Sequence, residues 1–420
     1  MMLFTSIYGV IDGFFVSNFA GKTAFTAVNF IFPLIMLLST IGFMFGAGGS
    51  ALISKTMGEG DNKRANSQFS LLVIVVFVLS TILTILGVIF LRDISYLLGA
   101  RGQLLEDTVT YGRIIMFSLP AFSLQNAFQS YFVTAEKPTL GLLVTVGAGV
   151  TNIVFDGILV GVVNMGLVGA AIATALSQCI GGILPIVYFI LPNKSLLRLG
   201  KPIWDGRGLL KATTNGASEL LNNVSMNLVG MLYNVQLLKY AGEDGVAAYG
   251  VIMYVSFMFV SVFLGYSIGS APIIGYHYGA KNKDELKNIL KKSAVIIGVM
   301  SLLMFVLGEA LSGVVSGIFV GYDETLLAIT KRGFIIYSVA YLVMGYGIFA
   351  SGFFTALSDG LTSGLISLLR TLVFQVLCIY LLPLVIGVDG IWISVFIAEG
   401  LALIVSIVLL VVKRKKYGYM

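Results

Sequence analysis

Long apolar runs alternate with short polar segments along the whole of this 420-residue sequence. A helix that crosses a bilayer needs about 20 predominantly apolar residues, and roughly twelve stretches reach that length. They lie near residues 1–18, 25–54, 66–91, 110–133, 139–162, 167–191, 212–240, 246–278, 288–313, 331–356, 362–385 and 388–412. The pattern therefore predicts an all-α polytopic membrane protein with twelve transmembrane helices.

Composition supports this prediction and excludes several other classes of protein. Hydrophobic residues make up 58% of the chain and charged residues only 11%, whereas soluble proteins carry about 25% charged residues. The net charge of +6 comes from basic residues in short loops between apolar runs, so we expect no nucleic-acid partner. Cys179 and Cys378 lie inside apolar runs and His277 is the single histidine. We therefore expect no disulfide framework, no zinc site and no cofactor.

Lysine and arginine are distributed unevenly between the loops on the two sides of the membrane. The even-numbered connections and the tail Lys413–Lys416 hold most of these residues. Because basic residues are enriched in cytoplasmic loops, we expect these connections and the C-terminus to be cytoplasmic. The prediction is a multi-pass protein of the cell (inner) membrane that is surrounded by lipid and monomeric.

The second half of the sequence repeats the first at a nearly constant offset. Gly48 matches Gly269, and the same offset pairs Gly58 with Gly279 and Gly166–Gly169 with Gly387–Gly390. Six spans per repeat give two parallel six-helix repeats, an arrangement found in transporters with the substrate path between the halves. We expect a six-helix half at 1–191, a cytoplasmic linker at 192–208 and a second half at 209–420. The counterpart of the first span would start before Met1, so we expect a truncated N-terminus, with an unusually short first helix as the alternative.

Four polar residues in the spans of the first half are predicted to form one intramembrane site. Asn152 and Asp156 are four residues apart and share a helix face, Thr174 lies in the next span, and Asp12 lies in the first. A carboxylate at bilayer depth costs about 2.5–3.5 kcal/mol on insertion scales and by default marks a functional site. The alternative is a structural knot of hydrogen bonds between helices.

The two halves differ at this site. At the offset that relates Gly48 to Gly269, the residues Asn152, Asp156 and Thr174 correspond to Val373, Leu377 and Val395. Two neighbouring carboxylates cannot both ionise cheaply in a medium of low dielectric, so the set suits either a proton or a Na⁺ ion. Oxygen ligands favour a hard cation over a transition metal. The residues alone leave the choice between H⁺ and Na⁺ open.

Other charged residues within the predicted spans are candidates for a second site or for a structural pair. Glu219 is a second candidate acidic site. Arg370 and Glu399 lie in the last two spans, and we expect them to form a structural ion pair because pairing lowers the cost of insertion. At the same offset, Glu399 corresponds to Gln178.

The order of these features resembles the multidrug and toxic-compound extrusion (MATE) transporters over essentially the whole chain. YGVIDGFFVSNFAG is similar to the family's first-span motif, and SKTMGEGDNKRAN is similar to its first cytoplasmic loop. The Asp12, Asn152, Asp156 and Thr174 pattern resembles the cation site of the DNA-damage-inducible protein F branch. Glu219 matches the seventh-span glutamate of the sodium-coupled branch, whose tenth-span aspartate has no counterpart in FIIYSVAYLVMGYGIFASGFF.

The resemblance implies an antiporter, driven by H⁺ or Na⁺, that exports amphipathic organic cations by alternating access. A lipid-linked saccharide flippase of the same superfamily is the first alternative, but it would need a basic site for pyrophosphate. An intramembrane enzyme that uses Asp12 and Asp156 is a second alternative. The internal repeat gives such an enzyme no explanation, so we expect a transporter.

Overall fold

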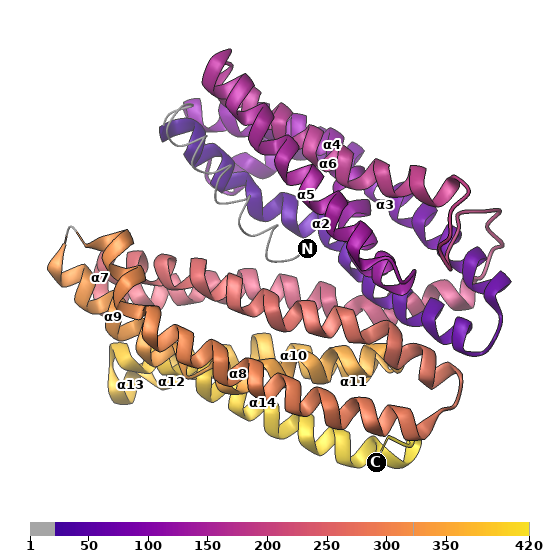
Figure 1. Cartoon of the computed structure of the whole chain (residues 1–420). Coiled ribbons are helices and arrows are strands. Elements are labelled where there is room, and N and C mark those ends of the chain that lie inside the picture. The colour runs from indigo at the N-terminus through magenta and orange to yellow at the C-terminus, as the bar shows by residue number, and fades with distance from the viewer. Residues whose placement is uncertain (1–21, 322, 420) are drawn as a thin grey trace. The chain divides into compact units, whose positions relative to one another are not determined.

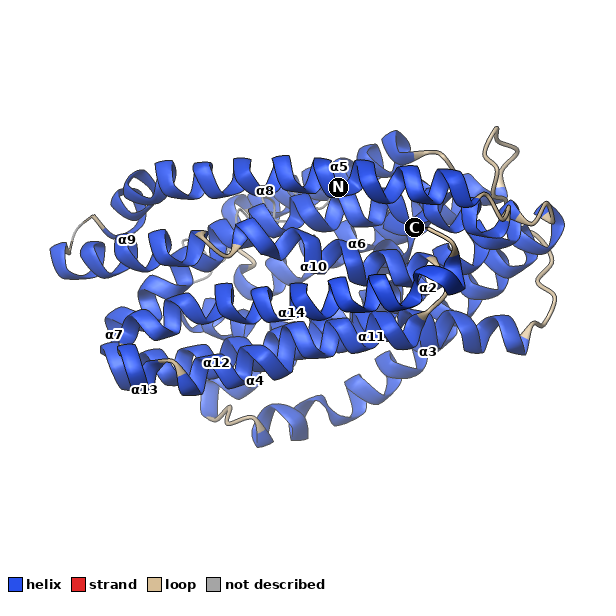
Figure 2. Cartoon of the chain, turned by 90° about the horizontal axis from the view of Figure 1, so that it is seen from below, coloured by secondary structure: helices blue, strands red, loops and turns tan. Residues whose placement is uncertain are grey.

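The computed structural model describes residues 22–321 and 323–419, and every regular element within them is helical (Figures 1 and 2). The predicted first span, at 1–18, lies outside the described residues, and so does Asp12. The chain divides into two compact units, Met1–Gly216 and Ala217–Met420.

Within residues 22–190, the described part of the first unit that precedes the linker, there are five long helices and one π-helical segment. They are α2 (Lys22–Gly58), α3 (Asn62–Leu97), α4 (Gly102–Thr134), α5 (Pro138–Phe155), η2 (Asp156–Val162) and α6 (Gly166–Ile190). Helix α7 (Gly206–Gly279) starts in this unit and continues into the second, with non-helical backbone at Gly242 (φ 66°, ψ −157°).

The second unit is built from α7 and the helices that follow it. These are α8 (Lys283–Val320), α9 (Glu324–Ser338), α10 (Tyr341–Ala356), α11 (Gly360–Leu368), η3 (Leu369–Val373), α12 (Phe374–Leu381), α13 (Pro383–Ile386) and α14 (Val388–Tyr417). Helix α8 packs on α9 and α10, and α14 packs on α10 and α12.

Eight of the described helices are long and apolar enough to cross a membrane, and the bent pair α9–α10 brings the number to nine. Two further predicted spans, 110–133 and 212–240, form helices (α4 and the first part of α7) that do not reach this apolar threshold. In α4 the reason is a series of buried polar side chains, including Gln125, Asn126 and Gln129. The predicted span 331–356 is not straight, because α9 and α10 meet at 50°.

The predicted repeat is visible in the local backbone of the two units. Asp61 caps α3 by accepting from Arg64 N, and its repeat counterpart Asn282 caps α8 by accepting from Glu285 N. Left-handed backbone also recurs at the repeat offset, at Gly60 and Lys281 (φ 87° and 56°) and at Gly166 and Gly387 (φ 54° and 60°). The two halves therefore share turn geometry as well as spacing.

Small residues bring α2 and α4 into direct backbone contact. A Cβ atom on Gly42 would lie 2.0 Å from the backbone oxygen of Ser123, and one on Gly46 would lie 3.0 Å from Ala127 Cα. Interfaces of this kind are typical of helices in membranes, where close packing and hydrogen bonds drive helix association. Across the same interface, the buried Tyr131 hydroxyl donates to Phe45 O at 2.8 Å.

The linker after α6 follows α3 through hydrogen bonds from its backbone. Arg198 N donates to Asn66 Oδ1 (2.7 Å), Gly200 N to Ser70 Oγ (2.9 Å) and Ile203 N to Ser67 Oγ (2.8 Å). The start of α7, at Gly206, falls before the predicted end of the linker at 208. These bonds order a loop that composition alone predicts only as a connection.

In the second unit, Asp359 anchors the C-terminal end of α14 to the α10–α11 loop. Its carboxylate accepts from Tyr417 OH (2.7 Å) and Thr362 N (3.3 Å), and the Nζ atoms of Lys413 and Lys416 lie 3.6 and 3.8 Å away. Burial alone raises the pKa of Asp359, but these hydrogen bonds and the charge of Lys413 outweigh it, so the pKa lies below its ordinary value.

We expect Gly42→Ala to destabilise the protein by about 1–3 kcal/mol, because the new methyl group overlaps the α4 backbone. Gly147→Ala in α5 is the matched control, since no atom lies within 4 Å of the added Cβ. Alanine favours a helix over glycine by up to about 1 kcal/mol, so the control is neutral or stabilising. Denaturant unfolding in detergent measures both variants, and equal stability of the two would contradict the close-contact assignment.

Asp359→Asn is expected to lower stability at neutral pH by about 1.5–3 kcal/mol, the value of a buried hydrogen bond to a charged group. The pKa of Asp359 is lower in the folded state than its unfolded value of about 3.9. Its contribution is therefore complete above that value and disappears as pH falls through the folded pKa. Unfolding curves of wild type, Asp359→Asn and the exposed control Asp93→Asn between neutral and acidic pH test this. A wild-type advantage that stays constant down to strongly acidic pH would refute it.

Candidate functional site

The predicted single helix at 139–162 changes its hydrogen-bonding pattern at Asp156. Residues up to Phe155 form α5, and Asp156–Val162 form the π-helix η2, with Val163 N donating to Ile158 O five residues earlier (2.8 Å). The predicted single span is present as Pro138–Val162, but sequence periodicity does not reveal that its last part is π-helical. Such π-helical segments are rare and occur frequently at functional sites.

Asn152 and Asp156 are buried on either side of this change. The side chain of Asn152 is 1% exposed and that of Asp156 is 0% exposed. The backbone N–H of Asp156 donates to Asn152 O, so one helical turn separates the two residues. Asn152 Nδ2 donates to Thr174 Oγ1 of α6 over a long 3.5 Å.

The described structure thus brings Asn152 and Thr174 into contact and places Asp156 one turn from Asn152. The fourth predicted member of the site, Asp12, lies outside the described residues.

Two further contacts hold α5 and η2 against α6 around this group. Ser177 Oγ donates to Ala148 O at 2.7 Å, one turn before Asn152. Beyond Asp156, a Cβ atom on Gly169 would lie 3.0 Å from Leu159 O, so the backbones of η2 and α6 approach closely. Neither contact was expected from the sequence, although the small residues GLVGAAIATA in α6 are a signal of close packing.

The donor set of this group is suited to a proton or a hard monovalent cation. It offers a carboxylate, an amide oxygen and a hydroxyl oxygen, and Asn152 Oδ1 is buried with no hydrogen-bond partner among the described residues. A buried acceptor of this kind is costly unless a donor or a cation satisfies it. No group of three or more His, Cys, Asp or Glu side chains that could hold a metal occurs in the described ranges.

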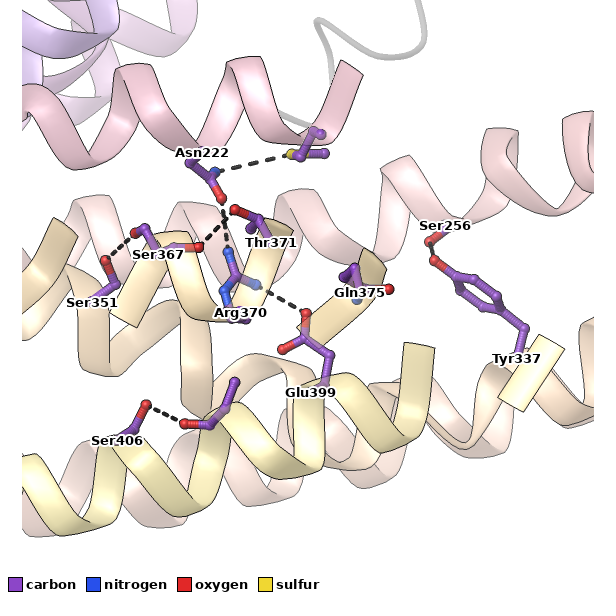
Figure 3. Close-up of polar contacts among 12 residues, drawn as sticks. Asn222, Ser256, Tyr337, Ser351, Ser367, Arg370, Thr371, Gln375, Glu399 and Ser406 are labelled. Carbon is purple, nitrogen blue, oxygen red and sulfur yellow. Dashed lines mark hydrogen bonds and ion pairs between the residues drawn. The ribbon is translucent and has the colours of Figure 1, made fainter. Parts of the chain in front are cut away.

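The second unit contains a separate charged group, which Figure 3 shows between three of its elements. Arg370 of η3 lies with Nη1 3.3 Å from Glu399 Oε1 of α14, and its Nη2 donates to Asn222 Oδ1 of α7 at 3.0 Å. The predicted Arg370–Glu399 pair is therefore present. Sequence analysis missed Asn222, although it lies in the polar segment NGASELLNN beside Glu219.

Glu219, the second candidate acid, is half-buried on α7. It lies close enough to Arg370 for the guanidinium charge to act on it. Asn223 Nδ2 donates to the backbone oxygen of Glu219 at 2.9 Å, a bond that does not involve the carboxylate.

Comparison with known proteins gives consistent results over the length of the chain. The family model described as MatE matches residues 1–158 and 220–381. The sequence is 25% identical over 430 residues to the multidrug export protein MepA of Staphylococcus saprophyticus, covering 99% of this chain and 91% of that protein. It is 24% identical over 424 residues to the protein of the same name from Staphylococcus aureus, with the same coverage.

Solved structures with the same fold cover almost the whole chain. One is an outward-facing multidrug resistance MATE family transporter of the MOP superfamily, with a TM-score of 0.94 at 21% identity over 100% of this chain and 95% of that chain. Another is a MOP superfamily transporter from Pyrococcus furiosus, with a TM-score of 0.92 at 22% identity over 99% and 94%. The predicted all-α, two-repeat fold class is confirmed.

Proposed function

The chain belongs to the MatE family of membrane transporters, and on that premise we propose that it is a cation-coupled antiporter that exports amphipathic organic cations by alternating access. As a member of this family it is a transporter rather than an enzyme. The MepA relatives bear the name multidrug export protein. That name supports a broad range of small organic substrates for this chain.

The burial of Asp156 is the observation that carries the proposal. A carboxylate at this depth costs about 2.5–3.5 kcal/mol to insert, and its counterpart in the second half, Leu377, avoids that cost. Asn152 and Thr174 are likewise replaced by Val373 and Val395. A carboxylate needed only to shape the fold is expected more often in both repeats or in neither, so this asymmetry favours a functional role.

Cation binding at Asp156 would provide the coupling. We assign the coupling ion, H⁺ or Na⁺, to Asp156 with Asn152, Thr174 and the undescribed Asp12. Neutralising Asp156 lowers the cost of keeping this carboxylate buried and lets η2 pack more tightly on α6. Only a difference in cation affinity between two states of the protein can drive such a change. The irregular backbone of η2 is a suitable place for it, because its hydrogen bonds can change register without unfolding a helix.

Substrate chemistry is inferred from the charges that remain in the described spans. Asp156 and Glu219 add negative charge, and the chain has 29 Phe and 19 Tyr residues whose rings can bind cations. Glu219 is retained as a second candidate acidic site. A flippase for a pyrophosphate-linked lipid would need free basic groups, whereas the buried Arg370 is engaged by Glu399 and Asn222.

The remaining assignments concern location and assembly. We place the protein as a monomer in the cell membrane with its C-terminus in the cytoplasm. The basic residues at the end of α14, Lys413–Lys416, support this orientation.

Efflux of ethidium from vesicles, with Na⁺ and H⁺ gradients imposed separately, tests the proposal. We expect one gradient to drive efflux by the wild type and Asp156→Asn to lose at least about tenfold in rate, which corresponds to a barrier higher by about 1.4 kcal/mol. Asn keeps the size of the side chain but binds neither ion as a carboxylate does. Asp12→Asn is expected to behave in the same way.

Asp93→Asn is the matched control, because it makes the same chemical change at an exposed position of α3. Full gradient-driven efflux by Asp156→Asn at normal expression would show that the site assignment is wrong. Efflux driven by neither gradient in the wild type would instead favour a lipid or saccharide substrate.

A further inference from the structure

Arg370, Glu399 and Asn222 form a buried group that is composed like a cation-binding site. The guanidinium of Arg370 takes the position of the bound cation. Arg370 and Glu399 are both buried, with side chains 7% and 4% exposed. Their elements, η3 and α14, are joined to α7 through Asn222 (Figure 3). The guanidinium thus contacts one carboxylate and one amide oxygen, the same two kinds of ligand that Asp156 and Asn152 offer in the other unit.

The repeat places neutral residues at the corresponding positions of the first half. At the offset that relates Gly48 to Gly269, Arg370 corresponds to Gly149 and Glu399 to Gln178. Gln178 Oε1 accepts a hydrogen bond from Ser118 Oγ at 2.6 Å, so a neutral contact replaces the charged one. The cation and its carboxylate therefore occur together in one half and are both missing from the other.

The ion pair is incomplete on one side. Arg370 Nε and Glu399 Oε2 are buried and have no hydrogen-bond partner among the described residues. Gly347 of α10 faces both side chains, because a Cβ atom there would lie 2.9 Å from Arg370 Cδ and 3.3 Å from Glu399 Oε2. Gly347 lets the α10 backbone pack directly against this side of the pair, where Glu399 Oε2 keeps an acceptor position that no described residue fills.

We propose that Arg370 is a tethered cation that takes the place of a coupling ion in the second half, so that only the first half exchanges cations with solution. This inference rests on the proposed antiport, since it concerns how many ions are coupled. The guanidinium forms an ion pair with Glu399 by direct contact, and its charge also acts on Glu219 at longer range. An arginine suits this role because its guanidinium stays charged in proteins.

Removing the guanidinium of Arg370 shows whether Glu399 then needs a cation from solution. In Arg370→Gln, Glu399 stays buried without its counter-charge and must take up a proton or Na⁺ from solution. The other titratable groups around it are Glu219 on α7 and Tyr337 on α9, whose hydroxyl lies 3.3 Å from Ser256 Oγ. Asn222 and Gly347, which also adjoin the pair, do not titrate.

The test measures the unfolding of the purified full-length protein in detergent, without drug or gradient, over a range of pH in sodium or choline chloride. The variants are Arg370→Gln, Arg370→Gln with Glu399→Gln, and Arg370→Gln with Glu219→Gln. The folded Arg370→Gln protein should hold a proton that its unfolded chain has released above about pH 4.3. Its stability relative to wild type should then fall as pH rises, by up to about tenfold in the folding equilibrium per pH unit for one linked proton. If the variant binds Na⁺ instead, sodium should stabilise it more than it stabilises wild type.

Adding Glu399→Gln should abolish this new dependence, and adding Glu219→Gln should preserve it. An Arg370→Gln protein with the pH and sodium profile of wild type would overturn the proposal, as would a new dependence that survives Glu399→Gln. If Arg370→Gln does not fold, the charge-neutral double variant with Glu399→Gln must fold, and its failure would show a purely structural role for Arg370. These readouts involve no transport, so loss of antiport in the vesicle assay would leave their outcome interpretable by itself.

Discussion

This structure depends on one constraint, which is that a charged side chain inside an apolar helix must be compensated by an opposite charge or by polar groups. Only 11% of the residues are charged, and a charged side chain inside an apolar span is costly unless it has a partner or a polar setting. The first half places amide and hydroxyl groups near Asp156, and in the proposed mechanism an exchangeable ion balances its charge. The second half balances Glu399 with Arg370. Two repeats with one backbone plan thus solve the same electrostatic problem with different chemistry.

In both halves the charged residue lies in an irregular part of a helix. Asp156 starts η2 and Arg370 lies within η3, so each charged residue is carried by a π-helical segment. A π-turn widens the helix and shifts the side chains that follow around its axis. Elsewhere the helices are held by small residues in close contact, as at Gly42 and Gly169. Tight packing beside a locally irregular backbone confines structural adjustment to the neighbourhood of the charge.

The sequence predicts the helical fold, the repeat and the Arg370–Glu399 pair, because span length, spacing and charge cost are local properties of the chain. It also predicts the contact of Asn152 with Thr174, since two polar residues in adjacent apolar spans favour each other. It does not predict η2, η3 or the bend between α9 and α10, because π-helical and α-helical segments share an apolar pattern. Asn222 was missed since its partner is 148 residues away, and no local signal encodes that contact.

The measurement that tests cation exchange most directly imposes a drug gradient and follows the ion movement that it drives. It is the reverse of ion-driven drug efflux. Vesicles with the protein in their membrane are given a gradient of ethidium and no ion gradient. The internal pH and the uptake or release of radioactive sodium are followed together. Because coupling between two ligands is reciprocal, movement of the drug should drive H⁺ or Na⁺ in the opposite direction in wild type. That ion movement should be absent in Asp156→Asn. Drug movement by the wild type without counterflow of either ion would contradict the antiport mechanism.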